Sequence, residues 1–284
     1  MRTLNTIGHE HAEPVLRSLA FALLEHEGDS PAKRDDKADL PWRHNVERAA
    51  KLRADWLTGN VDPAATREML ETLRQANEDE VCEKVVEQVN RGIAPQAIWD
   101  ALFVGAGELL ARQPGIVALH AVTTTNALRY AFDTSANDDT RRMLLLQNAA
   151  FVTMFRQAMV ARGGKLADQK LDEMQPISLD GGGEKAVEEI FANVSGDKKK
   201  AAGKVLAYLG SHPDPTDFIT AARVLIFLKG TNAHDYKFSS AVLEDYANIS
   251  PDWRARYLAS SVFNLRGSGA GDNKLVARAR AALG

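Results

Sequence analysis

The chain has 284 residues, of which 45% are hydrophobic, enough to bury a substantial core in one large domain or two ordinary ones. Its 35 basic and 38 acidic side chains leave a formal charge of −3, and no basic block alternates with aromatic residues, so nucleic acid is not an expected partner. A single cysteine, Cys82, excludes an internal disulfide framework and a cysteine-based zinc site.

The expected compartment follows from the same composition. One cysteine fits a reducing environment, and the first residues lack the basic-then-apolar pattern of a signal peptide. No stretch approaches the roughly 18 uncharged apolar residues that a membrane span needs. The sequence therefore predicts a cytoplasmic protein with no membrane partner.

Apolar residues recur at helical spacing along nearly the whole chain, while alternating β-branched runs are nearly absent. This pattern predicts an all-α protein, a multi-helical bundle-like single domain over residues 1–284. The first helix is expected within 13–28, with Pro14 in its first turn and Gly28 as its C-cap, and residues 29–42 are expected to form a loop. N-terminal signals predict further helices from Asp62, Glu78, Ala94 and Gly115, and a long apolar one within 138–162.

A polar interval at 163–183 is the expected seam of the domain. It runs into "DGGGEK", which lacks the preceding strand and the glycine–lysine spacing of a phosphate-binding loop. Helices are then expected within 197–210, 214–230, 232–246, 250–265 and 272–283. No repeat of fixed period is present, so a regular solenoid is not predicted.

Three of the seven histidines have simple structural interpretations. His212 precedes a proline in a turn, and His44 lies near a helix start that it could cap. His26 falls in the last turn of the first helix, where imidazole interacts favourably with free carbonyl groups.

Three other histidines are open to a second interpretation. His120 falls in an apolar helical stripe, where it is either a hydrogen-bonded core residue or a ligand. His9 and His11 form an H-x-H ahead of Pro14, and an extended segment there would point both rings to one side.

His234 and Lys237 stand three positions apart at the expected start of a helix, so their side chains share one helical face. Val242 and Leu243 lie near the same sector, which predicts that it faces inward. A lysine ammonium buried without a partner is costly and tends to lose its proton. The alternative is a solvated lysine beside a histidine at a helix start.

Three segments together resemble the questin oxidase-like family: "GHEHAEPVLRSLAFALL", "GIVALHAVTTTNALRYAF" and "NAHDYKFSSAVLEDY". The matching residues are His11, His120, His234 and Lys237. The resemblance implies an all-helical oxygenase with one non-haem iron, held by histidines and by a lysine that carries carbon dioxide as a carbamate. It also implies an aromatic or polycyclic organic substrate that reacts with dioxygen. Pro14 stands where the family has a second histidine, so His9, His26 or His44 is left as a possible further ligand.

The resemblance also suggests roles for the neighbours of these residues. A carbamate on Lys237 would give an anionic oxygen ligand beside neutral imidazoles. Asp235, Asn126 and Thr124 are candidates to orient the imidazole rings. Tyr236 and Arg129 are the candidate catalytic residues, with substrate contact as their role, although core packing is the alternative for the tyrosine, as it is for Tyr130.

Two other functional classes remain open. A carbamylated lysine beside histidines also builds hydrolase metal sites that activate water, and iron rather than zinc would separate the two enzymes. The third class is a non-catalytic helical scaffold, which should contain no metal.

Overall fold

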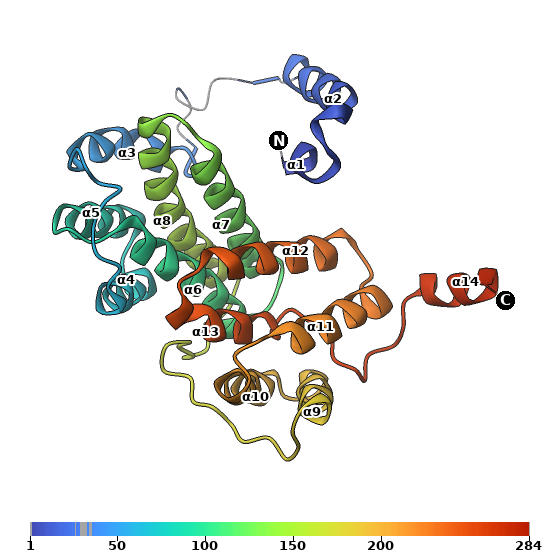
Figure 1. Ribbon diagram of the computed structural model, residues 1–284. Coiled ribbons are helices and arrows are strands. Elements are labelled where there is room, and N and C mark those ends of the chain that lie inside the picture. Colours follow the sequence, from blue (N-terminus) through green and yellow to red (C-terminus); the bar gives the residue numbers. More distant parts are fainter. Residues whose placement is uncertain (1, 26, 29–32, 34–35, 284) are drawn as a thin grey trace. The chain divides into compact units, whose positions relative to one another are not determined.

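The computed structural model describes residues 2–25, 27–28, 33 and 36–283 (Figure 1). Within these residues the regular structure is helical apart from one isolated bridge between Asn60 and Ile93, which confirms the predicted all-α fold class. The chain divides into two compact units, residues 1–40 and 41–284. No helix in the described part of the chain is long and apolar enough to cross a membrane.

The first unit contains α1 (Arg2–Ile7), the 3-10 helix η1 (His9–His11) and α2 (Ala12–Leu24). Gly8 joins α1 to η1 with a φ of 100°, a conformation that side chains with a Cβ rarely adopt. The H-x-H segment is thus a 3-10 turn rather than the extended chain expected. Residues two apart in a 3-10 helix point in different directions, so His9 and His11 do not face one side. His26 lies outside the described residues.

The second unit opens with helices whose starts the sequence marks by capping residues. The Asp62 side chain accepts the backbone N–H of Ala64, and Asn77 forms a capping box with Glu80. The helices are α3 (Leu40–Lys51), α4 (Pro63–Gln75), α5 (Glu78–Asn90), α6 (Pro95–Arg112), α7 (Ile116–Thr134) and α8 (Asp138–Ala161).

Helix α6 lies at the centre of the second unit and packs against α4, α7, α8 and α13. It is buried on every side from Ala97 to Ala111, as its nearly continuous apolar sequence requires. A Cβ at Gly107 would come within 2.5 Å of Ser260 Oγ on α13, so glycine is what allows these two helices to approach.

The second half of this unit packs α12 against α7 and α13, and α10 against α9 and α13. Its helices are α9 (Glu184–Val194), α10 (Lys198–Ser211), α11 (Thr216–Lys229), α12 (Ala233–Asn248), α13 (Pro251–Ser261) and α14 (Lys274–Leu283). The sequence did not predict α9, although its buried residues have helical spacing: Ala186, Val187, Ile190, Phe191 and Val194.

Residues 163–183, the expected seam, form an irregular segment inside the second unit. The segment is bound at both ends, because Ala167 N–H donates to Arg112 and Ile177 N–H donates to Gly203. The division of the chain falls at residue 40 instead.

Candidate functional site

The N-terminal end of α12 fixes the position of His234. The side-chain oxygen of Asn232 accepts the backbone N–H of His234 at 2.8 Å and lies 3.2 Å from Nδ1 of its ring. An amide oxygen can only accept a hydrogen bond, so Nδ1 carries the hydrogen and the free electron pair lies on Nε2. Asn232 therefore holds the His234 ring at Nδ1.

His120 on α7 lies against His234 on α12, with ring centroids 5.7 Å apart and ring planes at 62°. Both side chains are exposed, which corrects the expectation that His120 is embedded in the core. Position 120 lies on the side of α7 opposite its buried arc, so the ring points outward. That arc consists of Ala118, Leu119, Ala121, Val122, Thr123, Thr125 and Asn126.

The separation of the two rings fits a shared metal ion. Two imidazoles on one tetrahedral ion place their ring centroids roughly 5.3 Å apart when each metal–nitrogen distance is about 2.1 Å. The observed 5.7 Å is close to that value.

A buried polar cluster fixes α7 to α12 further along the two helices. The Asn126 amide donates to Glu244 at 2.9 Å and to Asp245 at 2.8 Å, and the Tyr257 hydroxyl of α13 donates to Asp245 at 2.7 Å. Burial, together with the neighbouring Asp245 carboxylate, raises the pKa of Tyr257 well above its ordinary value. This cluster sets how α7 and α12 lie against each other, and hence how the two histidine rings meet.

Lys237 is exposed, one turn after His234. The expectation that this sector faces inward is therefore wrong. Helix α12 buries Phe238, Ala241, Val242 and Asp245, and the helical period leaves Lys237 on its flank.

The two predicted catalytic residues are both engaged with the protein. Tyr236 packs near Phe227, with ring centroids 6.1 Å apart, and its hydroxyl lies 3.4 Å from the carbonyl of Gly230. Arg129 donates to Asp133 on its own helix and to Gln96, and its guanidinium lies 5.4 Å from the Trp99 ring centroid. These contacts match the packing alternative for Tyr236 and make Arg129 a link between α6 and α7.

The residues expected to orient the imidazoles have other partners. The Asp235 carboxylate accepts the backbone N–H of Thr231 at 2.7 Å as part of the α12 cap. Asn126 belongs to the buried cluster, and Thr124 is half-buried on α7. The ring of His234 is instead oriented by Asn232, whose position directly before "AHD" marked it as a helix cap but not as an imidazole partner.

The remaining described histidines lie apart from this pair in their contacts. His44 lies inside α3 and pairs with Asp79 at 2.9 Å rather than capping a helix. His212 is an exposed residue at the end of α10 and stacks on Tyr208, in line with the predicted turn. His9 and His11 belong to the first unit, and both are exposed. Across the described residues, no group of three or more His, Cys, Asp or Glu side chains is arranged to hold a metal ion.

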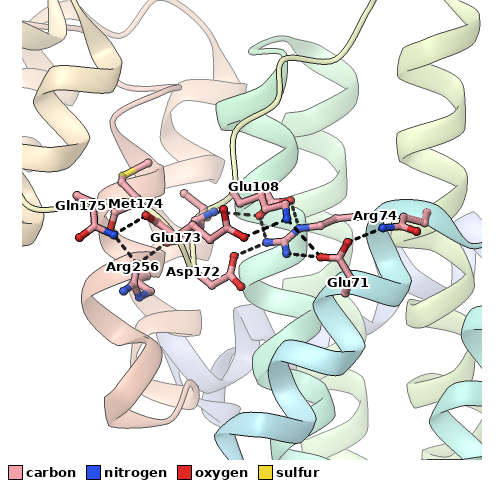
Figure 2. Close-up of polar contacts among 11 residues, drawn as sticks. Glu71, Arg74, Glu108, Asp172, Glu173, Met174, Gln175 and Arg256 are labelled. Carbon is pink, nitrogen blue, oxygen red and sulfur yellow. Dashed lines mark hydrogen bonds and ion pairs between the residues drawn. The ribbon is translucent and has the colours of Figure 1, made fainter.

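A second polar cluster surrounds Arg74 on α4 (Figure 2). Arg74, Glu108 and Asp172 are nearly buried, whereas the Glu71 side chain is 45% exposed. The Arg74 guanidinium donates to both oxygens of Glu108 on α6, at 2.9 and 2.6 Å, and also to Asp172 and Glu71. Burial disfavours the charge on Arg74, but hydrogen bonds to Glu108 and Asp172 outweigh it, so the pKa of Arg74 lies above its ordinary value.

The Arg74 cluster binds the irregular segment 163–183 to the helices. Glu108 accepts the backbone N–H of Leu171 at 3.0 Å, and Arg256 on α13 donates to the carbonyls of Leu171 and Met174 at 2.6 and 3.1 Å (Figure 2). Arg74, Glu108, Asp172 and Arg256 each have charged or hydrogen-bonding partners. Its chemistry is that of a structural clamp.

Comparison of the chain with models of protein families, with curated proteins and with solved structures finds no match.

Proposed function

We propose that the edge between α7 and α12 binds one transition metal ion through His120 and His234, and that the chain is a metal-dependent oxidoreductase. The observation that carries this proposal is the contact between the two rings, 5.7 Å between centroids, in segments far apart in the sequence. The orientation of His234 supports it, because Asn232 occupies Nδ1 and leaves Nε2 free to bind.

The reaction class comes from the resemblance to the questin oxidase-like family. It is the oxidation of an aromatic or polycyclic organic substrate by dioxygen, and non-haem iron is the metal that supplies redox chemistry for it. Lys237 completes the proposed ligand set within the second unit. His11, which the resemblance also implies as a ligand, belongs to the first unit and is not part of this proposal.

Lys237 is the proposed ligand that distinguishes this site from one made of histidines alone. Burial is one way to make a lysine amine neutral and reactive toward carbon dioxide. Lys237 is exposed, so a carbamate there depends on the bound cation to favour the anionic product. Lys237→Ala should then weaken metal binding, and Lys237→Glu should partly restore it with a carboxylate oxygen. Equal affinity of both variants and the unaltered protein would remove Lys237 from the ligand set.

Metal content tests the proposal directly. After anaerobic loading with ferrous iron and removal of free metal, we expect about one equivalent per chain. His120→Ala and His234→Ala should each lower the occupancy, whereas His212→Ala, at an exposed histidine stacked on Tyr208, should not. A protein that retains no metal, or variants that retain full occupancy, would contradict the proposal. Zinc rather than iron in the protein as isolated would favour a hydrolase.

A non-catalytic helical scaffold is the second candidate function. It is favoured by the exposure of His120, His234 and Lys237, and by the lack of a three-residue ligand group among the described residues. A scaffold predicts no retained metal under the same loading conditions.

A further inference from the structure

Helix α14 is an amphipathic helix with no buried residue. Helical spacing gathers Leu275, Val276, Ala279 and Leu283 on one side, and Leu275 and Leu283 are 57% and 90% exposed. Arg278 and Arg280 flank this apolar side, Lys274 adds a third cation at the start of the helix, and the helix contains no acidic residue. Helix α14 therefore presents an apolar stripe between positive charges.

The residue before α14 is hydrogen-bonded to the C-terminal end of α11, which has exposed apolar side chains of its own. The Asn273 amide, directly before α14, donates to the carbonyls of Phe227 and Gly230 at 2.7 and 2.9 Å. Phe227 and Val224 on the adjoining face of α11 are 69% and 52% exposed. Figure 1 shows α14 beyond the C-terminal end of α11. The start of α14 is thus tied beside an exposed aromatic ring.

The positive charge of this region is largely free to act on a partner. Arg280 lies 3.8 Å from Asp272, but its side chain is 75% exposed, and Asp272 also accepts the ammonium of Lys229 at 3.2 Å. Lys274 and Arg278 are exposed. Arg223, next to Val224 on α11, adds a further exposed cation.

We propose that α14 and the exposed face of α11 at Val224 and Phe227 form a docking surface for an anionic lipid membrane. Basic amphipathic helices lie in the membrane interface with their apolar side among the acyl chains and their cations against phosphate groups. Such binding is distinct from spanning a membrane, and it revises the expectation of no membrane partner. The inference is independent of the metal site.

A second copy of the chain fits this surface less well. Two α14 helices would bring six like charges together, which is unfavourable. A helix of 10 residues also provides little of the roughly 1,200–2,000 Å² that a stable protein interface buries.

Vesicle flotation of the full chain tests the proposal. We expect the chain to bind vesicles of phosphatidylcholine that contain about 30 mol% phosphatidylserine. Binding to vesicles of phosphatidylcholine alone should be at least about tenfold weaker, because each basic residue near an anionic surface raises the affinity roughly fivefold. The double variant R278Q/R280Q should bind the anionic vesicles at least tenfold more weakly. The matched control K199Q/K200Q removes two exposed cations from α10 and should bind like the unaltered chain.

The outcomes separate the possible occupants. No vesicle binding by the unaltered chain overturns the proposal. So does an equal loss in the α14 variant and the α10 control, which would mean that overall charge decides. A concentration-dependent dimer in analytical ultracentrifugation that R278Q/R280Q abolishes, without vesicle binding, would assign the surface to a second copy.

Discussion

The Arg74 cluster and the His120–His234 pair differ in how far their polar side chains are buried and paired. Arg74 and Glu108 are nearly sealed from water, with side chains 8% and 4% exposed, and each is matched by charged or hydrogen-bonding partners. The two histidines lie on an exposed edge, where Asn232 is beside Nδ1 of His234. The first arrangement uses its hydrogen-bonding capacity to hold the fold, and the second leaves capacity for a ligand.

The comparison teaches that a perturbed charge is not by itself a sign of a functional site. Arg74 has one of the strongest pKa shifts in the described part of the chain, yet its geometry is that of a clamp. The functional candidate consists of groups held in place but not saturated. Four predictions test this distinction.

The largest expected effect is the loss of Arg74. Arg74→Met leaves Glu108 buried without its cation, which should lower the free energy of unfolding by about 3–5 kcal/mol. Arg91→Met is the matched control, because Arg91 pairs with Glu68 on the surface, and it should lower the free energy of unfolding far less. Urea unfolding followed by circular dichroism measures both. Similar losses in the two variants would mean that the cluster is not a clamp.

A smaller loss is expected for the buried cluster beneath the histidines. Tyr257→Phe removes the hydroxyl that donates to Asp245 and should cost about 1–3 kcal/mol. Tyr236→Phe, which removes a hydroxyl 3.4 Å from its acceptor, should change stability by less than about 0.5 kcal/mol. If the two variants unfold at the same urea concentration, the hydrogen bond from Tyr257 to Asp245 does not stabilise the fold.

The ion pair between Arg91 and Glu68 should affect how the free energy of unfolding changes with pH in acid. The hydrogen bond from Arg91, opposed by burial, lowers the pKa of Glu68 to about 2. Because the folded-state pKa is depressed, the stabilisation is present above the unfolded pKa near 4.5 and is lost as pH falls from there toward 2. The exposed position of Glu68 limits the effect to less than about 1 kcal/mol. Glu68→Gln should flatten this part of the curve, and an unchanged slope would contradict the assignment.

The smallest effect on stability is expected at the exposed histidines. Without metal, His120→Ala and His234→Ala should each change the free energy of unfolding by no more than about 0.5 kcal/mol, since both side chains are exposed. With metal, the unaltered protein should gain stability that both variants lack, because a ligand stabilises the state that binds it. A loss of several kcal/mol in the metal-free variants would make the pair structural.

The sequence predicted most helices because their starts carry local signals. Asp62 and Asn77 cap α4 and α5 as their neighbours indicate. Helix α9 was missed because it follows three glycines, and α3 because it begins within a stretch that contains prolines. Glycine and proline disfavour helices locally, but packing against the rest of the fold outweighs this preference at both positions.

The site was only partly predictable. The resemblance named His120 and His234, whose rings meet, but the apolar spacing around them left open whether they face inward, and both are exposed. The Arg74 cluster was not foreseen, because Glu108 and Asp172 are 34 and 98 residues from Arg74 and one of them lies in a segment without periodicity. Contacts of this kind depend on how helices pack, which no local pattern encodes.

The most direct test of the account is a double-mutant cycle on metal affinity, with cobalt(II) as a coloured probe titrated into the full chain. If His120 and His234 bind one ion, removing either ring should cost most of the affinity, and the double variant should lose much less than the sum of the two single losses. Visible absorption of the bound cobalt should fall in both single variants. Additive losses, or cobalt affinity that neither substitution changes, would contradict a shared metal site at the α7–α12 edge.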